Sequence, residues 1–474
     1  MAREVLWTAQ EAADATGGEN TRDWQATGLS LNTRNLEKGD LFFALQGPNF
    51  DGHDYVADAF EKGAAVAVVQ RRPERLADDA SLLIVDDTLG ALNRFGAAAR
   101  ANSSAKFIGV TGSVGKTSIK EILRHCLSRQ DVTAASAASF NNHWGVPLSL
   151  ARMQRNAVYA INEMGMNSPG EIKELSKLVR PHVAIISTIE AAHFEFFKSI
   201  EDIAEAKCEI FEAMSTDGVA VLNRDHTLFD LMAERARENG VQNIIGFGES
   251  PQADARLIGY ELFAEYSRVQ ADICGEILDY TISNPGFHWI LNSLAALAAI
   301  KAVGADAKKA AAELSTLHGL PGRGEKTVLA LANGKKFELI DDSYNANPAS
   351  VHACINVLAN ATPDNAGRRI AVLGDMLELG RQSRKIHVDL AGPINDSGID
   401  LVFTCGPHME ALHEALPANM RGVHKNNSQE LAPVLAQALR ADDVVSVKGS
   451  LGSRMSVIIE NLKSLSAQNS GGQA

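Results

Sequence analysis

The chain has 474 residues, of which 45% are apolar, and a formal net charge of −13 at pH 7. A chain of this size buries an ample core and is expected to form about three domains. Its acidic balance excludes an extended nucleic-acid surface, so we expect no nucleic-acid partner. Neither end shows a secretion signal, and no stretch approaches the roughly 18 apolar residues that span a bilayer. We therefore expect a cytoplasmic protein without membrane insertion.

The chain begins with short strands and helices separated by turn-rich segments, which predicts a small α/β unit over residues 1–86. An alanine-rich helix is expected from about Leu89 to Ala101. It leads through Asn102-Ser103-Ser104 into the next strand. A central unit is expected over residues 87–320.

The run FIGVTGSVGKT (107–117) places an apolar strand before a glycine-bearing turn, a lysine and a hydroxyl residue. Such a turn points backbone N–H groups at a polyphosphate, and its lysine and threonine serve the outer phosphates and magnesium. The spacing is a variant of the Walker pattern, because Val110 stands where a glycine is usual. A plain strand-to-helix turn is the alternative to ATP binding. The residues expected to hold ATP here are Gly112, Ser113, Gly115, Lys116, Thr117 and Ser118.

Apolar strands alternate with helical patterns after this turn, which predicts a parallel sheet. Its strands are expected at 158–162, 183–187 and 219–222, with a small antiparallel addition at 255–282. Three glycines and a proline at 319–324 predict a linker.

Beyond the linker the alternation restarts and predicts a second doubly wound unit over residues 321–474. Its strands are expected at 337–340, 370–373, 401–404 and 444–447. The small polar tail from Ser466 onward is expected to be irregular.

Polar residues just past the ends of parallel strands are candidates for the site, because ligands of such sheets bind there. Glu163 follows one strand and places a carboxylate where a magnesium held by Thr117 needs one. Taken alone, it is more often a solvated turn residue. His193 lies beyond the strand at 183–187, where a ligand and a structural histidine are about equally expected.

Lys207 lies on the apolar face of a helix expected to open at Ser199. A lysine there either extends its amine to solvent, the commoner case, or is held neutral by burial. A neutral amine can react with carbon dioxide to form a carbamate, which would offer a carboxylate to a second magnesium. The pattern alone does not favour this alternative.

His288 and Asn292 lie four residues apart on a helix expected after Pro285-Gly286, so both project from one face. An asparagine there pairs with adenine or caps a helix, with about equal expectation. Arg323 and Asp342 lie on the far side of the linker. They would reach phosphates and ribose only after domain closure.

A series of motifs, in order along the chain, resembles the Mur ligase family. The motifs are TGSVGKTS (111–118), FNNHWGVPLSL (140–150), EMGMNSPGEI (163–172), AAHFE (191–195), AEAKCEIF (204–211), PGFHWILNSLAALA (285–298), PGRGE (321–325), DDSYNANPAS (341–350), GDMLELG (374–380) and KGSLGSRM (448–455). The DDSYNANP and GDMLELG runs are most similar to the members that add D-alanyl-D-alanine.

The resemblance implies an α/β enzyme with three domains: a small amino-terminal α/β domain that binds a UDP-sugar, a central P-loop ATPase domain with a parallel sheet, and a carboxy-terminal Rossmann-like domain. It implies an ATP-dependent amide ligase of peptidoglycan precursor synthesis. ATP would phosphorylate the terminal carboxylate of UDP-N-acetylmuramoyl-tripeptide, and the amine of D-alanyl-D-alanine would attack the acyl phosphate. ADP and phosphate would be released. Two magnesium ions are also implied, and we expect a monomer.

Residue by residue, the resemblance implies catalytic roles for Lys116, Asn142, Glu163, His193 and carbamylated Lys207. Thr117 and Glu163 would hold one magnesium, and His193 with Lys207 the second. Asn142 would meet the γ-phosphate or the reacting carboxylate.

Other positions that match the family pattern would bind nucleotide or substrate. Those implied for the nucleotide are His288 and Asn292 at adenine, Arg323 and Asp342 at phosphate and ribose, and Tyr344, Asn345 and Asn347 along the cleft. Those implied for the substrate are Thr33, Arg34, Asp51 and Asn141.

The chain departs from the family pattern at three places. Asn32 stands where aspartate is usual, residues 187–190 read STIE instead of Thr-Asn-Ile-Gly, and Phe196-Phe197-Lys198 is bulkier than the usual glycine-containing turn. Three rival interpretations are open. The first is another ligase of the superfamily, such as a folylpolyglutamate synthetase. The others are a P-loop switch or motor and a binding protein without turnover. The amino-terminal unit and the DDSYNANP run disfavour the first, and the metal and phosphate residues disfavour the others.

Overall fold

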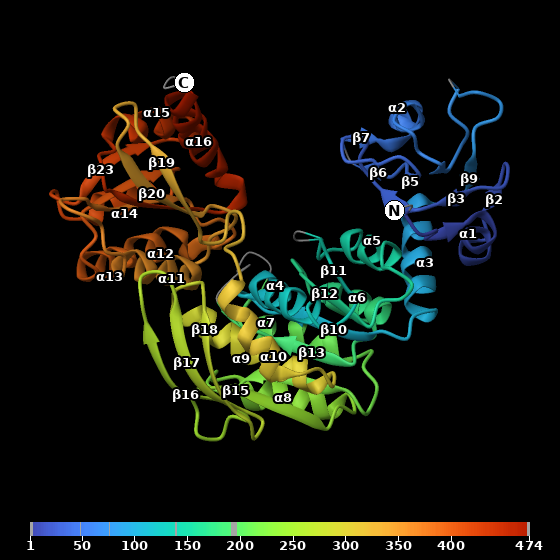
Figure 1. Ribbon diagram of the computed structural model, residues 1–474, viewed down its shortest axis with the longest axis horizontal. Helices are drawn as coiled ribbons and strands as arrows, with labels where there is room; N and C mark the ends of the chain where they lie inside the picture. Colours follow the sequence, from blue (N-terminus) through green and yellow to red (C-terminus); the bar gives the residue numbers. More distant parts are fainter. Residues whose placement is uncertain (1–2, 48, 75, 138–139, 191–196, 472–474) are drawn as a thin grey trace.

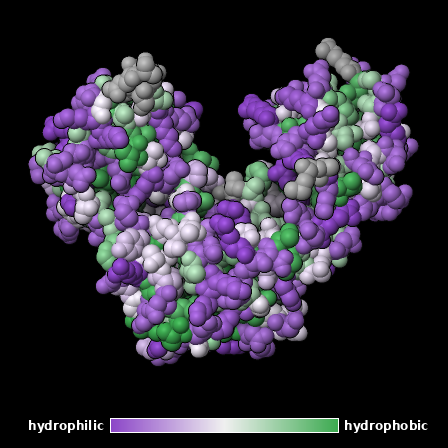
Figure 2. All heavy atoms as spheres, viewed as in Figure 1, coloured by the Kyte–Doolittle hydropathy of each residue, from purple (hydrophilic) through white to green (hydrophobic). Residues whose placement is uncertain are grey.

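The computed structural model describes residues 3–47, 49–74, 76–137, 140–190 and 197–471. They form three α/β lobes, and the amino- and carboxy-terminal lobes stand on opposite sides of the central one (Figure 1). The space-filling view shows a wide hollow between the two outer lobes (Figure 2). The expected fold class is confirmed. Among the described residues, none of the helices combines the length and the apolar character that crossing a bilayer requires.

The amino-terminal lobe is built on a five-stranded sheet of order β2-β9-β8-β5-β4. Its strands are β2 (Glu19–Asn20), β4 (Gly28–Ser30), β5 (Asp40–Phe43), β8 (Val66–Val69) and β9 (Leu82–Ile84). Two separate two-stranded sheets are formed by β1 (Trp7–Thr8) with β3 (Gln25–Ala26) and by β6 (Gln46–Gly47) with β7 (Phe50–Asp51). Its helices are α1 (Ala9–Thr16) and α2 (Val56–Glu61), with the 3-10 turn η1 (Gly52–Tyr55) between β7 and α2.

Helix α3 (Thr88–Ala101) connects the first two lobes. The ring centroid of its Phe95 lies 4.4 Å from that of Trp7 and 5.1 Å from that of Phe43. One face of the helix therefore completes the amino-terminal core. Helix α3 also packs on α5 (Gly145–Ala151) of the central lobe. The predicted helix is therefore confirmed, and it is shared by two cores.

The central lobe holds a nine-stranded sheet of order β11-β12-β10-β13-β14-β15-β16-β17-β18. Its strands are β10 (Lys106–Thr111), β11 (Thr133–Ala135), β12 (Tyr159–Glu163), β13 (Val183–Ile186), β14 (Val219–Asn223), β15 (Asn243–Gly248), β16 (Ala255–Leu262), β17 (Ser267–Ile273) and β18 (Ile277–Ile282). All pairs from β11 to β16 are parallel, and β16, β17 and β18 pair antiparallel. Both the parallel sheet and its antiparallel addition are as predicted.

Helices cover both faces of this sheet, which explains why strands such as β13, with the sequence VAII, are buried along their whole length. These helices are α4 (Lys116–Leu127), α5, α6 (Glu171–Val179), α7 (Ile200–Cys208), α8 (Phe229–Glu238), α9 (Phe287–Ala302) and α10 (Ala307–Glu313), with the 3-10 turns η2 (Glu209–Phe211) and η3 (Leu314–Thr316).

The carboxy-terminal lobe holds a six-stranded sheet of order β19-β20-β24-β21-β22-β23, in which only the edge strand β19 is antiparallel. Its strands are β19 (Glu325–Ala330), β20 (Lys336–Asp342), β21 (Arg369–Gly374), β22 (Leu401–Cys405), β23 (Arg421–Lys425) and β24 (Val444–Lys448). Its helices are α11 (Pro348–Ala359), α12 (Ser383–Asp389), α13 (Ala391–Asp396), α14 (Met409–Ala415), α15 (Ser428–Ala438) and α16 (Ser456–Gly471), with η4 (Gly380–Gln382) and η5 (Leu451–Ser453).

The expectation of an irregular tail is wrong up to residue 471, because α16 continues to Gly471, and residues 472–474 lie outside the described residues. Two contacts hold this helix on the edge strand β19. The Ser466 hydroxyl accepts a 2.8 Å hydrogen bond from the Ala330 N–H, and Lys463 pairs with Glu325 at 3.2 Å. A polar, small-residue sequence is thus helical because it docks on a sheet edge.

A hairpin of the central lobe reaches the carboxy-terminal lobe beside the linker. The Lys326 ammonium on β19 donates to the Ala264 carbonyl at 2.8 Å and lies 3.0 Å from Glu265, both in the turn between β16 and β17. This bridge ties the antiparallel addition to the second sheet.

Candidate functional site between two sheets

A cleft of about 750 Å³ lies between the central and carboxy-terminal lobes. The residues that follow β10, β12, β13 and β14 line one wall, and those that follow β20, β21 and β24 line the other. Both sheets therefore turn the carboxyl ends of their parallel strands toward one space, where ligands of such sheets bind.

The phosphate turn requires glycine at two positions. Gly112 has φ 140° and Gly115 has φ 88°, which disfavour any residue with a Cβ. At Gly115 an added Cβ would also stand 2.7 Å from Oδ1 of Asn292 on α9. The turn is thus closed on one side by the helix that carries Asn292.

The unusual STIE run packs against the phosphate turn. The Ser113 N–H donates to the Thr188 carbonyl at 2.8 Å, and the Ser113 hydroxyl accepts from the Glu190 N–H at 3.0 Å. The Ser187 hydroxyl donates to the Val114 carbonyl. Residues 187–190 therefore hold the turn in place from the end of β13, mostly through backbone groups.

Lys116 opens helix α4, and its ammonium donates to the carbonyls of Gly112 and Ser113 at 2.5 and 3.3 Å. Burial lowers the pKa of Lys116, and the positive charge of Arg323 lowers it further, whereas the Glu163 carboxylate raises it. A polyphosphate in the turn would, like Glu163, stabilise the ammonium form.

Thr117, Asn141 and Glu163 meet beside Lys116. The Thr117 hydroxyl donates to one Glu163 oxygen at 2.8 Å, and the Asn141 amide donates to the other at 2.8 Å. Glu163 is 1% exposed and Thr117 6%. A buried hydroxyl and carboxylate, both hard oxygen donors at one point, fit a magnesium ion.

Asn142 lies next to this group but has a different use in the structure. Its side-chain oxygen accepts a 2.9 Å hydrogen bond from the Gly145 N–H at the start of α5. Asn141, its neighbour, lines the cleft. The expected role of Asn142 at the reacting groups stays a prediction.

Lys207 is 1% exposed on α7. Burial, with the charge of Lys116 as a second cause, holds the pKa of Lys207 well below its usual range. The sequence left open whether the Lys207 amine reaches solvent or is buried, and the structure has it buried. His193, its expected partner, lies outside the described residues. Within the described ranges there is no group of three or more His, Cys, Asp or Glu side chains placed to hold a metal.

His288 and Asn292 both line the cleft from α9, one helical turn apart. Burial lowers the pKa of His288 to about 4, and the charge of Lys448 adds to this effect. The imidazole is therefore neutral at pH 7, with one donor and one acceptor nitrogen to offer a ligand.

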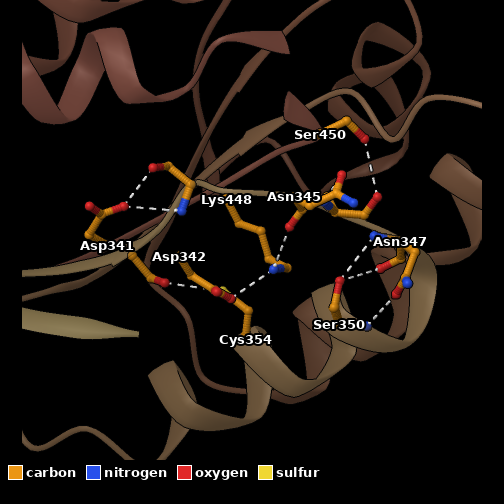
Figure 3. A network of polar contacts seen from close by, with 11 residues as sticks. Asp341, Asp342, Asn345, Asn347, Ser350, Cys354, Lys448 and Ser450 are labelled. Carbon is orange, nitrogen blue, oxygen red and sulfur yellow. Dashed lines mark hydrogen bonds and ion pairs between the residues drawn. The ribbon is translucent and has the colours of Figure 1, made fainter. Parts of the chain in front are cut away.

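The opposite wall is built by the residues after β20 and β24 (Figure 3). The Lys448 ammonium donates to Asp342 at 2.8 Å and to the Asn345 carbonyl at 2.9 Å, and Lys448 is 3% exposed. Burial raises the pKa of Asp342, and Lys448 opposes the shift. Arg323 lies over the Tyr344 ring at 4.3 Å, a cation–π contact that anchors the linker.

Asn347 serves mainly to begin a helix. Its side chain accepts from the Ser350 N–H at 2.9 Å, and the Ser350 hydroxyl accepts from the Asn347 N–H at 3.0 Å, which is a capping box at the start of α11. The turn before this helix is thereby held at the cleft wall.

The chain matches three models of one family in series. "Mur ligase family, catalytic domain" matches residues 25–122, "Mur ligase middle domain" residues 110–300, and "Mur ligase, glutamate ligase domain" residues 322–451. A curated relative from Rickettsia prowazekii, named UDP-N-acetylmuramoyl-tripeptide--D-alanyl-D-alanine ligase, is 34% identical over 96% of this chain and 99% of its own length. The chain belongs to the Mur ligase family.

Solved structures of Mur ligases superpose on nearly the whole chain. MurF from Acinetobacter baumannii has a TM-score of 0.83 at 30% identity and covers 98% of this chain and 100% of its own. MurF ligase from Thermotoga maritima in complex with ADP has a TM-score of 0.75 at 25% identity, covering 93% and 98%.

Most of the residues that the sequence predicted for this Mur ligase site come together. Those that line the cleft are Ser113, Gly115, Lys116, Thr117, Ser118, Asn141, Glu163, His288, Asn292, Arg323, Asp342, Tyr344, Asn345 and Asn347. Thr33, Arg34 and Asp51 are in the amino-terminal lobe and do not line it.

Asp51 in particular is engaged within its own lobe. Its carboxylate accepts from the His53 N–H at 2.9 Å and from Arg71 at 2.8 Å, and these contacts with His53 and Arg71 lower the pKa of Asp51 to about 2. The carboxylate therefore caps η1. Its expected substrate contact stays a prediction.

The sequence prediction gave no role to two buried lysines, of which Lys448 lines the cleft and Lys120 does not. Lys448 ends β24 and stands beside Asp342, a position that the rule for strand ends already marks. Lys120, on the phosphate-turn helix, is fully buried and donates to the Ser136 carbonyl at 2.9 Å. The Ser136 hydroxyl in turn accepts from the Glu163 N–H at 3.3 Å. No sequence pattern separates such a lysine from a solvated one.

Proposed function

We propose that this chain is an ATP-dependent amide ligase that adds D-alanyl-D-alanine to UDP-N-acetylmuramoyl-tripeptide, through an acyl phosphate, in peptidoglycan precursor synthesis. The observation that carries the proposal is the cleft in which the phosphate turn, the Thr117–Glu163 pair and the Lys448–Asp342 pair face one another. The curated relatives bear the name of this activity over the full length of the chain.

The chemistry is a pair of substitutions. A carboxylate oxygen of the tripeptide attacks the γ-phosphorus of ATP, the bond to the bridging oxygen breaks, and ADP leaves. The amine nitrogen of the dipeptide then attacks the acyl carbon, the bond to the phosphate oxygen breaks, and the nitrogen loses a proton. A carboxylate and a γ-phosphate repel each other, so the first step needs positive charge and donor groups around them.

This chain supplies such groups from both walls of the cleft. The Lys116 ammonium would move from the turn carbonyls to the outer phosphates, and N–H groups of the turn would donate to the same phosphates. Asn141 holds the Glu163 carboxylate in position. His288, neutral at pH 7, would contact the adenine, and Arg323 and Asp342 the phosphate and ribose; the support is that all three line the same cleft.

Thr117 and Glu163 would hold one magnesium ion, which neutralises phosphate charge when bound. Lys207 would serve a second site as a carbamate. The support for this is a buried amine with a strongly lowered pKa, because only the neutral amine reacts with carbon dioxide, forming the N–C bond and releasing a proton.

We also propose the division of the chain into a UDP-sugar-binding unit (1–86), an ATP-binding unit (87–320) and a ligase unit (321–474). Thr33, Arg34 and Asp51 would contact the UDP-sugar, and Asn142 the reacting groups. We place the enzyme in the cytoplasm, as a monomer.

Phosphate release tests the proposal. Purified protein with ATP and Mg²⁺ should release phosphate only when UDP-N-acetylmuramoyl-tripeptide and D-alanyl-D-alanine are both present. Stimulation by glutamate or a folate in their place would assign another ligase activity. Offering tripeptides that end in lysine or diaminopimelate would show which of the two is used.

A further inference from the structure

Two leucines are exposed on the carboxy-terminal wall of the cleft. Leu377 is 40% exposed and Leu451 65%, and both line the cleft. The other large apolar side chains that the described residues leave exposed do not line it. Covering these two leucines with an apolar group of a ligand would be favourable.

The two leucines form one surface. Leu377 follows β21 and Leu451 follows β24, and these strands are neighbours in the sheet. A Cβ added to Gly452 would stand 2.6 Å from Cδ1 of Leu377. The Leu377 side chain therefore lies against the backbone next to Leu451, in space that only a glycine leaves free.

Ser450 holds this surface in place. Its N–H donates to the Asp375 carbonyl at 3.0 Å, and its hydroxyl accepts from the Leu377 N–H at 2.9 Å. The same hydroxyl donates to the Ala346 carbonyl at 3.1 Å, as Figure 3 shows. One side chain thus joins the turns after β20, β21 and β24, and a surface organised in advance binds at a lower entropic cost.

The leucines follow other strands than Asp342, which the proposed function assigns to the nucleotide. Asp342 ends β20, which is joined to the linker through β19, whereas β24 and β21 come next in the sheet. Neighbouring strands are about 4.8 Å apart. Leu451 therefore follows the strand next to β20, and Leu377 follows the strand after that.

We infer that Leu377 and Leu451 receive the incoming amine substrate and select a peptide with small apolar side chains, here the methyl groups of D-alanyl-D-alanine. The inference rests on the proposed function and assigns residues to the acceptor side of that same site. Leucine offers no hydrogen bond, so a charged side chain placed there would lose water without gaining a partner. The surface thus discriminates against acidic or basic amino acids as nucleophiles.

Acceptor peptides with fewer methyl groups test this inference. Wild-type protein is assayed for phosphate release with D-alanyl-D-alanine, D-alanylglycine and glycyl-D-alanine. Each lost methyl should lower kcat/KM about fourfold. In Leu377→Ser and Leu451→Ser, the loss for the methyl that the replaced leucine contacts should shrink toward no change, while the KM for ATP stays as in wild type.

Leu465→Ser is the matched control, because Leu465 is 39% exposed on α16 and does not line the cleft. It should keep the wild-type ratios. Ratios are compared within each enzyme, so a partly misfolded preparation does not change them. Wild-type ratios in both cleft variants, or a raised KM for ATP alone, would overturn the inference while the proposed function stands. Absence of any dipeptide-dependent phosphate release from wild type would overturn both.

Discussion

Thr117 and Glu163 are joined by a 2.8 Å hydrogen bond that links the first turn of α4 to the end of β12. The strands β10 and β12 are parallel neighbours, and Val110 pairs with Glu163 in their register. The register of two strands thus brings the carboxylate level with the phosphate turn, and small shifts of either strand would separate the two oxygen donors.

Replacing Glu163 with glutamine should reduce kcat about 100-fold, the scale for losing one preorganised polar group at a reacting centre. It should also raise the Mg²⁺ concentration for half-maximal rate, because an amide oxygen is a weaker ligand than a carboxylate. Phosphate release across a Mg²⁺ titration measures both. Glu174→Gln, an exposed carboxylate on α6, is the control. An unchanged Mg²⁺ dependence in Glu163→Gln would contradict the assignment.

Lys207→Ala should be nearly inactive and should regain part of its activity with short carboxylic acids, which replace the carbamate oxygens. Wild-type activity should also fall when carbon dioxide and bicarbonate are removed. Phosphate release with and without added acetate is the measurement. Lys177→Ala, on the exposed face of α6, should behave as wild type under both conditions. Full activity of Lys207→Ala without rescue would remove the carbamate from the mechanism.

His288 should make stability depend on pH in a specific window. Its folded pKa of about 4 lies below the ordinary value of 6.5, so between these values the unfolded chain binds more protons. Stability contributed by the neutral ring is complete above about pH 6.5 and is lost as pH falls toward 4. Melting temperatures from pH 7 to pH 4 should therefore fall less in His288→Gln than in wild type or in His352→Gln, which alters an exposed histidine. Parallel curves for all three proteins would argue against this prediction.

Lys120 and Glu121 form an ion pair at 2.9 Å in which the lysine is fully buried. Lys120→Met should lower the free energy of unfolding by about 2 kcal/mol, because the Ser136 carbonyl loses its donor and Glu121 keeps only its pair with Arg124. The double change Lys120→Met with Glu121→Met should cost less than the single change. Urea denaturation measures both. Lys62→Met, which breaks the exposed pair with Asp58, should cost under about 1 kcal/mol. A single change no costlier than this control would show that the pair adds nothing.

The alternation of strands and helices was enough to predict both parallel sheets, because fully buried strands such as β13 are continuous apolar runs. Short strands escaped prediction. β11 has the sequence TAA with three half-buried residues, and nothing in it differs from a loop. Its place at the sheet edge depends on pairing with β12, which is a tertiary effect.

The candidate site was predictable where a residue follows a strand end or sits in a glycine turn, as for Lys116, Glu163 and Asp342. The role of a side chain in capping was not. The side chains of Asn142 and Asn347 accept hydrogen bonds from N–H groups at the starts of α5 and α11. The sequence shows only that each is an asparagine near a turn. Lys448 and Lys120 were missed because burial of a charge depends on partners distant in the chain.

The two walls of the cleft belong to sheets with separate cores, so a triphosphate bound across it would act as a reversible crosslink between two folding units. Each unit then contributes only part of the binding free energy, and neither holds the ligand after the other has unfolded. In scanning calorimetry, heat absorption by the central and carboxy-terminal lobes should therefore coincide when nucleotide is present and separate when it is withdrawn.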